Sequence, residues 1–183
     1  MSDARVKALV MVGAVGLVLV ALGACAPRTT RVPTTTGAFA PAPREPDGSA
    51  YRPQVMRLLE LVNIERAHGA ACGAQLMPPV PPLTLEPRLV RAAQLHSDDQ
   101  AAHFAMGHGG SDGSSPGVRA TRAGYVWSLV AENVAWNQPT PEVVMQAWMD
   151  SPGHCENIMR DGVVELGAGE TDLFWTLVFA APL

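Results

Sequence analysis

Two side chains with recognised chemistry, His154 and Cys155, are neighbours in the stretch AWMDSPGHCENIM, residues 147–159. Three interpretations fit such a pair. A free thiolate beside an imidazole is a catalytic dyad, the two side chains can share a metal ion, or the cysteine forms a structural crosslink beside a functional histidine. These interpretations need different redox surroundings, so the compartment of the protein decides among them.

The N-terminus has the pattern of an export signal. Arg5 and Lys7 form a short positive region, and residues 8–22 carry no charge and are almost all apolar. This run is shorter than the roughly 20 residues that a membrane-spanning helix needs, and it ends in small residues. It therefore predicts a signal peptide over residues 1–24, with an uncleaved membrane anchor as the alternative.

A cysteine follows the apolar run. The stretch LGAC, Leu22–Cys25, resembles the bacterial lipobox, in which the cysteine becomes the first residue of the mature protein and carries a lipid. The resemblance predicts lipidation of Cys25 and export to a bacterial cell envelope, with the lipid in the membrane. Ala26 resembles the residue at this place in lipoproteins sent to the outer membrane, so an outer-membrane or periplasmic location is expected.

Export leaves two further cysteines for pairing. With Cys25 lipidated, Cys72 and Cys155 remain in an oxidising compartment, and two cysteines can pair in only one way. Their bridge would close a loop of roughly 80 residues and stabilise the fold by about 4.5 kcal/mol in the chain-entropy model. We therefore expect a Cys72–Cys155 disulfide, with a nucleophilic Cys155 as the alternative.

The composition after the lipobox divides the chain into a tether and one domain. Residues 25–52 are rich in Pro and Thr and lack a hydrophobic period, which predicts a disordered tether. Residues 53–183 have the length of one domain and can form a hydrophobic core. The formal net charge is −4 and no basic stripe occurs, so nucleic acid is not an expected partner. We expect a monomer.

Hydrophobic spacing predicts two long helices in the first half of this domain. The first covers residues 54–69, and its apolar face is Val55, Leu58, Leu59 and Val62. A loop with four prolines between residues 78 and 82 follows, and Pro87 suits the first turn of a second helix, residues 87–106. One face of that helix is Leu89, Ala92, Ala93, His96, Gln100 and His103. We expect His96 to point inward or into a cleft, and His103 to lie at the surface or at the rim of the cleft.

The second half mixes loops, short helices and strands. The glycine-rich stretch 107–117 predicts a loop, residues 118–125 a short helix and residues 128–136 a strand. Thr140 and Ser151 are expected N-caps, each followed by proline, so His154 lies in a first helical turn, which disfavours its charged form.

The chain ends in two strand-like runs, residues 163–170 and 173–182, which predict an antiparallel hairpin. Helices and strands alternate irregularly, which favours an α/β fold with a small sheet covered by helices. Core positions are expected for Trp148 and Trp175. Trp127 and Trp136 flank the AEN segment and could wall the cleft, with core packing as the default expectation.

Six segments occur in the order and spacing of a known family: NIERAHGAACG, PPLTLEPRLVRAAQLHSDD, HGGSDGSSP, AENVAW, AWMDSPGHCENIM and VVELGAG. Together they resemble the bacterial branch of the CAP superfamily, which includes cysteine-rich secretory proteins, antigen 5 and plant pathogenesis-related proteins. The resemblance covers residues 53–183. It implies a three-layer α-β-α sandwich with a small, mostly antiparallel sheet between helices and a central cleft.

Members of this family line the cleft with two histidines and acidic residues. Carried over one by one, these are His108, Glu132 and His154, while Val118 stands where bacterial relatives often have Asp. Two imidazoles and one carboxylate can bind a divalent cation such as zinc or magnesium with open positions. Glu132 could instead orient one imidazole as a general base, or the three could brace a polar cleft floor. His96 and Ser111 are expected beside them.

Three functions remain open at this point. The first is an envelope-tethered binding module whose cleft takes a divalent cation and a small, lipid-like or protein ligand. The second is a metal-dependent or serine-type hydrolase, a peptidase that uses the same cleft, because proteolysis has been proposed within the superfamily. The chain has no G-x-S-x-G or H-E-x-x-H motif, and the serines to test as nucleophiles are Ser111, Ser114 and Ser115. The third is an adhesion or cell-wall interaction module that does not use the cleft.

Overall fold

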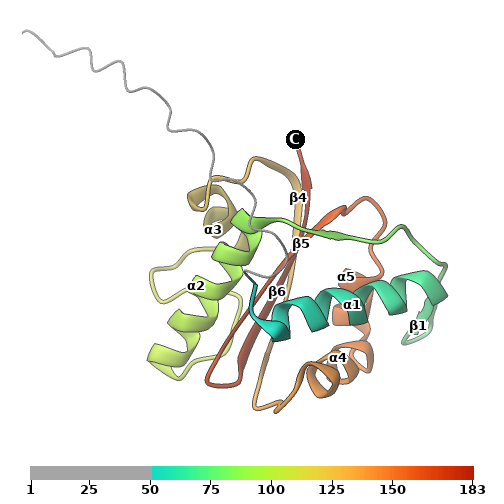
Figure 1. Cartoon of the computed structure of the whole chain (residues 1–183), viewed down its shortest axis with the longest axis horizontal. Coiled ribbons are helices and arrows are strands. Elements are labelled where there is room, and N and C mark those ends of the chain that lie inside the picture. Colours follow the sequence, from blue (N-terminus) through green and yellow to red (C-terminus); the bar gives the residue numbers. More distant parts are fainter. Residues whose placement is uncertain (1–50) are drawn as a thin grey trace, which may run out of the picture. The chain divides into compact units, whose positions relative to one another are not determined.

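A computed structural model describes residues 51–183 of the chain, which lie in one compact unit that extends to the C-terminus (Figure 1). The expected signal peptide, the lipidated Cys25 and most of the tether lie outside the described residues. The last tether position does not fit the expected disorder, because Arg52 donates a hydrogen bond to the carboxylate of Glu170 at 3.0 Å. None of the helices in the described part has the length and apolar character that a membrane crossing requires.

The centre of the domain is a four-stranded sheet with the order β3-β5-β6-β4. Its strands are β3 (Thr84–Leu85), β4 (Trp127–Trp136), β5 (Glu165–Thr171) and β6 (Phe174–Pro182). Only β3 is parallel to its neighbour β5; the pairs β5–β6 and β6–β4 are antiparallel. The expected C-terminal hairpin and the strand around the AEN segment are confirmed, and the sheet is mostly antiparallel as the resemblance implied.

The proline-rich stretch contains more order than the sequence predicts. Besides β3, it includes β2 (Gln75–Met77), which pairs with β1 (Ala70–Cys72) as a separate two-stranded sheet. The four prolines lie between β2 and β3, where they remove no ladder hydrogen bond. These strands have only two or three residues, too few to show a period of two.

Every helix in the described part begins with proline at its first position. Proline fits there because the first turn of a helix has backbone donors without a helical acceptor. Thr140 accepts a capping bond from the Val143 N–H, as expected, whereas the Ser151 side chain makes no such bond and only its carbonyl accepts from Cys155. The helices are α1 (Pro53–His68), α2 (Pro87–His103), α3 (Pro116–Arg122), α4 (Pro141–Met149) and α5 (Pro152–Ile158).

The helices form two layers with the sheet between them (Figure 1). Strand β6 shows why, because its side chains alternate between two apolar clusters. Trp175, Leu177 and Phe179 pack with α1, α4 and α5 on one face, and Val178 and Ala180 pack with α2 and α3 on the other. The three-layer α-β-α sandwich is confirmed.

Helix α2 lies unusually close to β5. A Cβ atom added to Gly167 would lie 2.1 Å from the backbone of Leu89, and one added to Gly169 would lie 2.5 Å from the backbone of Gln94. Only glycine allows backbones to approach this closely. The two glycines of the ELGAGE segment therefore set the distance between this helix and the sheet.

The expected tryptophan positions are half right. Trp148 and Trp175 are buried, but Trp127 and Trp136 lie at the two ends of β4 and are exposed. The default expectation of core packing was wrong for them because strand ends leave the covered part of a sheet. His103 is exposed, as expected, because it is the last residue of α2. The other residues of its helix face are buried: Leu89, Ala92, Ala93, His96 and Gln100.

Candidate functional site

Strand β4 places the two polar residues of its AEN segment, Glu132 and Asn133, on opposite faces of the sheet. Glu132 and Val130 point toward the layer of α2 and α3, and Asn133 points toward α5, where its amide donates to the carbonyl of His154. Two adjacent residues of the AEN segment therefore make contacts on opposite faces of the sheet.

Glu132 is a buried carboxylate with two partners. Its side chain is 1% exposed, one oxygen accepts from Nδ1 of His108 at 3.0 Å, and the other accepts from the guanidinium of Arg119 at 2.7 Å. Burying a carboxylate this deeply is costly unless hydrogen bonds and a counter-charge compensate for the lost water. Both of its oxygens are engaged within the protein.

His108 is oriented by its side chain and its backbone. Arg119 donates two bonds to the His108 carbonyl, both at 3.1 Å, and one to the Ser114 carbonyl at 2.8 Å. The hydrogen bond to Glu132 raises the pKa of the His108 imidazole, more than partial burial lowers it. The His108 side chain is 56% exposed. Because Nδ1 donates to Glu132, Nε2 carries the lone pair of the neutral ring.

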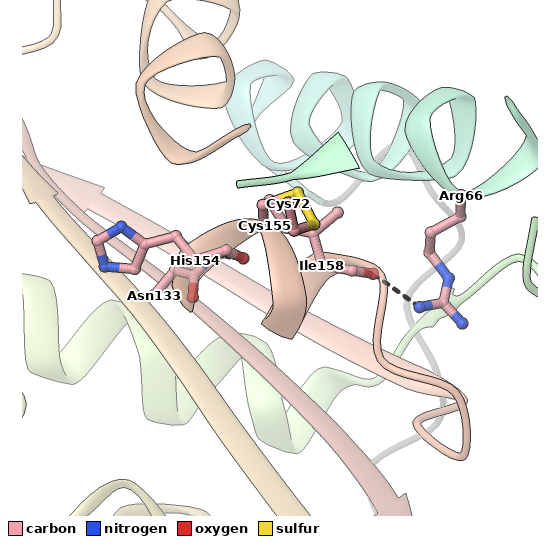
Figure 2. Close-up of a disulfide and its surroundings, with 6 residues drawn as sticks. All are labelled: Arg66, Cys72, Asn133, His154, Cys155 and Ile158. Carbon is pink, nitrogen blue, oxygen red and sulfur yellow. Dashed lines mark hydrogen bonds between the residues drawn. A yellow bond between two sulfur atoms is a disulfide. The ribbon is translucent and has the colours of Figure 1, made fainter. Parts of the chain in front are cut away.

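His154 comes to the site from the other layer, in the first turn of α5. Its carbonyl accepts from the Asn133 amide at 3.0 Å. Burial lowers the pKa of its imidazole, and the charge of His108 lowers it further. The neutral form predicted from the helix position is confirmed in direction, with burial as the main cause. Figure 2 shows the ring pointing away from the neighbouring disulfide.

The disulfide and a buried arginine fix α5. Cys72 and Cys155 are bonded and buried, with Cα atoms 5.4 Å apart, so the expected bridge is present and the thiolate dyad is not (Figure 2). At the far end of the helix, Arg66 donates to the carbonyl of Ile158 at 2.7 Å and to that of Arg160 at 3.0 Å. His154 is therefore on a helix that is held at its middle by the disulfide and at its C-terminal end by Arg66.

His96 and Ser111 lie near the site, and both make hydrogen bonds around the loop that carries His108. His96 is buried, its Nε2 donates to the carbonyl of Gly107 at 2.8 Å, and it is 3.9 Å from the nearest Glu132 oxygen. Burial lowers its pKa. Ser111 bonds Asp99 through its backbone N–H at 2.8 Å and through its hydroxyl. These residues support the loop that carries His108.

The serines proposed as nucleophiles have structural bonds. The Ser111 hydroxyl donates to Asp99, and the Ser115 hydroxyl caps α3. The backbone N–H of Ser114 donates to the side chain of Asp112. Within residues 51–183 no bond joins any of them to a histidine. None of these three serines therefore has a hydrogen-bonded histidine that could act as its base in the described part of the chain.

The three predicted ligands, His108, Glu132 and His154, differ in how closely the structure brings them together. Residues 51–183 contain no group of three or more His, Cys, Asp or Glu side chains that could hold a metal ion. His108 and Glu132 are joined, and His154 is near enough for its pKa to respond to His108. Glu132 has the place of a carboxylate that orients a ligating imidazole from behind.

A sequence profile now connects this geometry to known proteins. The profile of the Cysteine-rich secretory protein family, abbreviated CAP, matches residues 59–170, which is more than half of the chain. The chain belongs to the CAP family. The matched range contains His108, Glu132 and His154, so the whole candidate site lies inside the CAP domain.

One relative of this CAP domain is a bacterial protein. The uncharacterized protein YkwD of Bacillus subtilis strain 168 is 31% identical over 133 residues, which cover 72% of this chain and 47% of that protein. The chain therefore spans about half of that relative's length.

Solved structures show the same CAP fold. An extracellular protein with an SCP domain from Bacillus anthracis strain Ames matches with a TM-score of 0.62 at 24% identity, covering 69% of this chain and 40% of that one. An outer surface protein of Borrelia burgdorferi matches with a TM-score of 0.58 at 16% identity, covering 70% of this chain and 91% of that one. At these identities the likeness concerns the fold.

Arg119 is the site residue of this CAP domain that sequence reasoning missed. It follows Val118, the position where the resemblance led us to look for a carboxylate, and it is buried against Glu132. An arginine in a short helix is normally expected to face solvent. Only the fold shows that the Arg119 guanidinium forms an ion pair with Glu132. Val118 is exposed and lines a hollow beside His108.

Proposed function

We propose that this protein is an exported CAP-domain module, attached to the cell envelope through a lipid on Cys25, whose cleft binds a divalent cation and a small ligand. The lipobox-like LGAC segment supports the attachment. Export is supported by the relatives whose names describe an extracellular protein and an outer surface protein. The disulfide fits an oxidising compartment.

One observation carries the cation proposal, the 3.0 Å hydrogen bond from His108 Nδ1 to Glu132. It fixes the tautomer that leaves the Nε2 lone pair available, and a carboxylate behind a histidine raises the basicity of the ligating nitrogen. His154 supplies a second, neutral imidazole.

Two imidazole nitrogens favour zinc over magnesium, since magnesium prefers oxygen ligands. Two protein ligands also leave coordination positions open, so the ion would bind the polar group of a ligand and polarise it. Glu132 and Arg119 keep His108 in place whether or not the ion is bound.

Calorimetry with zinc and with magnesium on residues 51–183, the described domain, tests this. We expect zinc heat in the wild type, its loss in His108→Ala and in His154→Ala, and little heat from magnesium. His103→Ala, which changes an exposed histidine on α2, is the matched control and should keep the zinc heat. Equal zinc binding by all four proteins would refute the site.

A further inference from the structure

Three aromatic side chains form a cluster at one end of the central sheet. Phe174, at the start of β6, is buried, and its pairing partner Trp136, at the end of β4, stacks on it with ring centroids 5.6 Å apart. Phe104, which follows α2, meets Trp136 in a T-shaped arrangement at 5.1 Å. Phe104 and Trp136 are 73% and 41% exposed, and Met106, two residues after Phe104, is 54% exposed.

The backbone of Phe104 is in a conformation that suits other residues better. Its φ of 49° and ψ of 43° are left-handed, and glycine or asparagine usually ends a helix in this way. A bulky side chain is disfavoured there, and burial does not compensate, because most of the ring is exposed. Apart from its aromatic contacts, Phe104 therefore brings little to the fold, which indicates a role at the surface.

Trp136 combines a fixed apolar ring with a free hydrogen-bond donor. Phe174 covers one face of the indole and limits its orientation. Within residues 51–183 the Trp136 N–H has no hydrogen-bond acceptor, whereas the N–H groups of the other three tryptophans each donate to a protein oxygen. An exposed ring with a free N–H suits a boundary between an apolar and an aqueous phase.

The chain enters the domain at the same end of the sheet. Arg52, immediately before α1, donates to the Glu170 carboxylate at 3.0 Å. Glu170 pairs with Trp175, the neighbour of Phe174, and lies two residues before the turn between β5 and β6. Helix α1 then leads away from this end toward β1 (Figure 1). A tether from a lipid on Cys25 would therefore reach the domain beside the aromatic cluster.

The size and charge of the exposed surface favour a bilayer as its partner. Phe104, Met106 and Trp136 together expose roughly 350 Å², less than half of the about 800 Å² that each partner contributes to a stable protein–protein interface. A small surface is enough beside a membrane when an anchor already holds the domain there. Residues 51–183 contain no lysine, and the adjacent turn is flanked by acidic Glu170 and Asp172, so the contact would be apolar rather than electrostatic.

We propose that Phe104, Met106 and Trp136 form an interfacial surface that inserts into the head-group region of the bilayer to which the protein is anchored. The apolar side chains lie toward the acyl chains, and the Trp136 N–H donates to an ester or phosphate oxygen of a lipid. The domain is thereby oriented with the turn between β5 and β6 toward the membrane. The choice of a bilayer as partner rests on the proposed lipid on Cys25.

Sedimentation with lipid vesicles tests this surface on residues 26–183, which include the whole described domain and lack the lipid acceptor. We expect binding to phosphatidylcholine vesicles at millimolar lipid, with a partition constant below the roughly 10⁴ M⁻¹ of a single acyl chain. Replacing half of the lipid by phosphatidylglycerol should not strengthen binding, and higher salt should not weaken it. No binding to phosphatidylcholine, or binding that requires phosphatidylglycerol, would overturn the proposal.

Substitutions locate the contact. Phe104→Gly and Trp136→Ala should each weaken vesicle binding by about fivefold or more. Glycine fits the left-handed conformation, so Phe104→Gly should stay folded by circular dichroism. The matched control is Leu76→Ala on β2, which removes an apolar side chain that is 82% exposed and follows the far end of α1. Unchanged binding in Phe104→Gly, or an equal loss in Leu76→Ala, would contradict the assignment.

Sedimentation with insoluble peptidoglycan tests a glycan as the partner instead. If Trp136→Ala weakens binding to peptidoglycan and leaves vesicle binding unchanged, the bilayer is the wrong partner. If Trp136→Ala weakens only vesicle binding, the proposal is supported.

Fatty-acid labelling of Cys25 separates this surface from the anchor. If residues 26–183 do not bind vesicles while Cys25 in the full chain takes up the label, the surface fails and the anchor stands. If they bind through Phe104 and Cys25 takes up no label, the anchor fails and the surface stands. Because the contact is weaker than one acyl chain, it does not keep an unlipidated protein in a washed membrane fraction.

Discussion

At the scale of single residues, Glu132 determines the properties of the site. It is shared between a buried guanidinium and an exposed imidazole, so its charge is needed by both. Replacing it leaves Arg119 without a counter-charge in a buried place, which costs more than the pair itself contributes.

Glu132→Gln should lower the pKa of His108, because the hydrogen bond to the carboxylate is the main cause of its raised value. It should also reduce the free energy of unfolding by about 3 kcal/mol. Histidine titration by NMR and urea denaturation measure the two effects. The control is Glu156→Gln, at an exposed glutamate of α5, for which we expect a change within about 0.5 kcal/mol. An unchanged His108 pKa would disprove the assigned bond.

His96 should make the fold sensitive to acid. Burial lowers its pKa in the folded state, so the unfolded chain takes up the proton first as the pH falls through about 6.5. The unfolding free energy therefore decreases with falling pH in this window. His96→Gln keeps a donor for the Gly107 carbonyl and removes the titration, so its unfolding free energy should fall less steeply between about pH 6.5 and pH 5. Parallel pH profiles would contradict this.

The residues of the site could be predicted only where a motif contains them. His108, Glu132 and His154 were found through the resemblance, and the order of their segments does not say which pairs touch. The structure joins His108 to Glu132 and inserts Arg119 as the second partner. That contact depends on how α3 packs on β4, which no local pattern encodes.

At the scale of elements, helix starts were predicted better than short strands, because proline and capping residues mark them in the sequence. Prolines at helix starts and the Thr140 cap marked helices correctly, whereas β2 and β3 were too short to show a period. Pairing partners supply the stability of such strands, and the partners are distant in the sequence. The exposure of Trp127 was not predicted for a different reason, because the sequence does not show where a strand leaves the covered part of its sheet.

The contact of α2 with β5 yields a sharp comparison of two glycines. Gly167→Ala should reduce the free energy of unfolding by about 3 kcal/mol, because its Cβ would meet the Leu89 backbone and a helix must move. Gly153→Ala, at a helical position with no neighbour within 4 Å, should change stability by less than about 0.5 kcal/mol or raise it. Thermal unfolding checks both; equal losses would refute the close approach.

At the scale of the whole molecule, the described domain would be tied to a membrane by a segment outside the described residues. The domain presents its cleft from loops and strand β4, while the chain enters it at Arg52, before α1. The composition of residues 25–52 predicts a tether, and the lipobox predicts the anchor.

Cys25→Ser should therefore release the protein from the membrane fraction and abolish incorporation of a labelled fatty acid, since the thiol is the predicted attachment point. Thr30→Ser, a conservative change in the same segment, is the control and should alter neither. Fractionation and metabolic labelling in the native host measure the outcome. Labelled lipid on the serine variant would show that Cys25 is not the acceptor.

The alternation along β4 has a consequence for how this domain can diverge. Glu132 and Asn133 face opposite layers, one holding His108 and the other the carbonyl of His154. Inserting or deleting a single amino acid upstream in this strand would turn both side chains toward the wrong layer at once. Substitutions in this strand leave the direction of its other side chains unchanged. A one-residue change in its length would remove the contacts of Glu132 with His108 and of Asn133 with His154 in a single step.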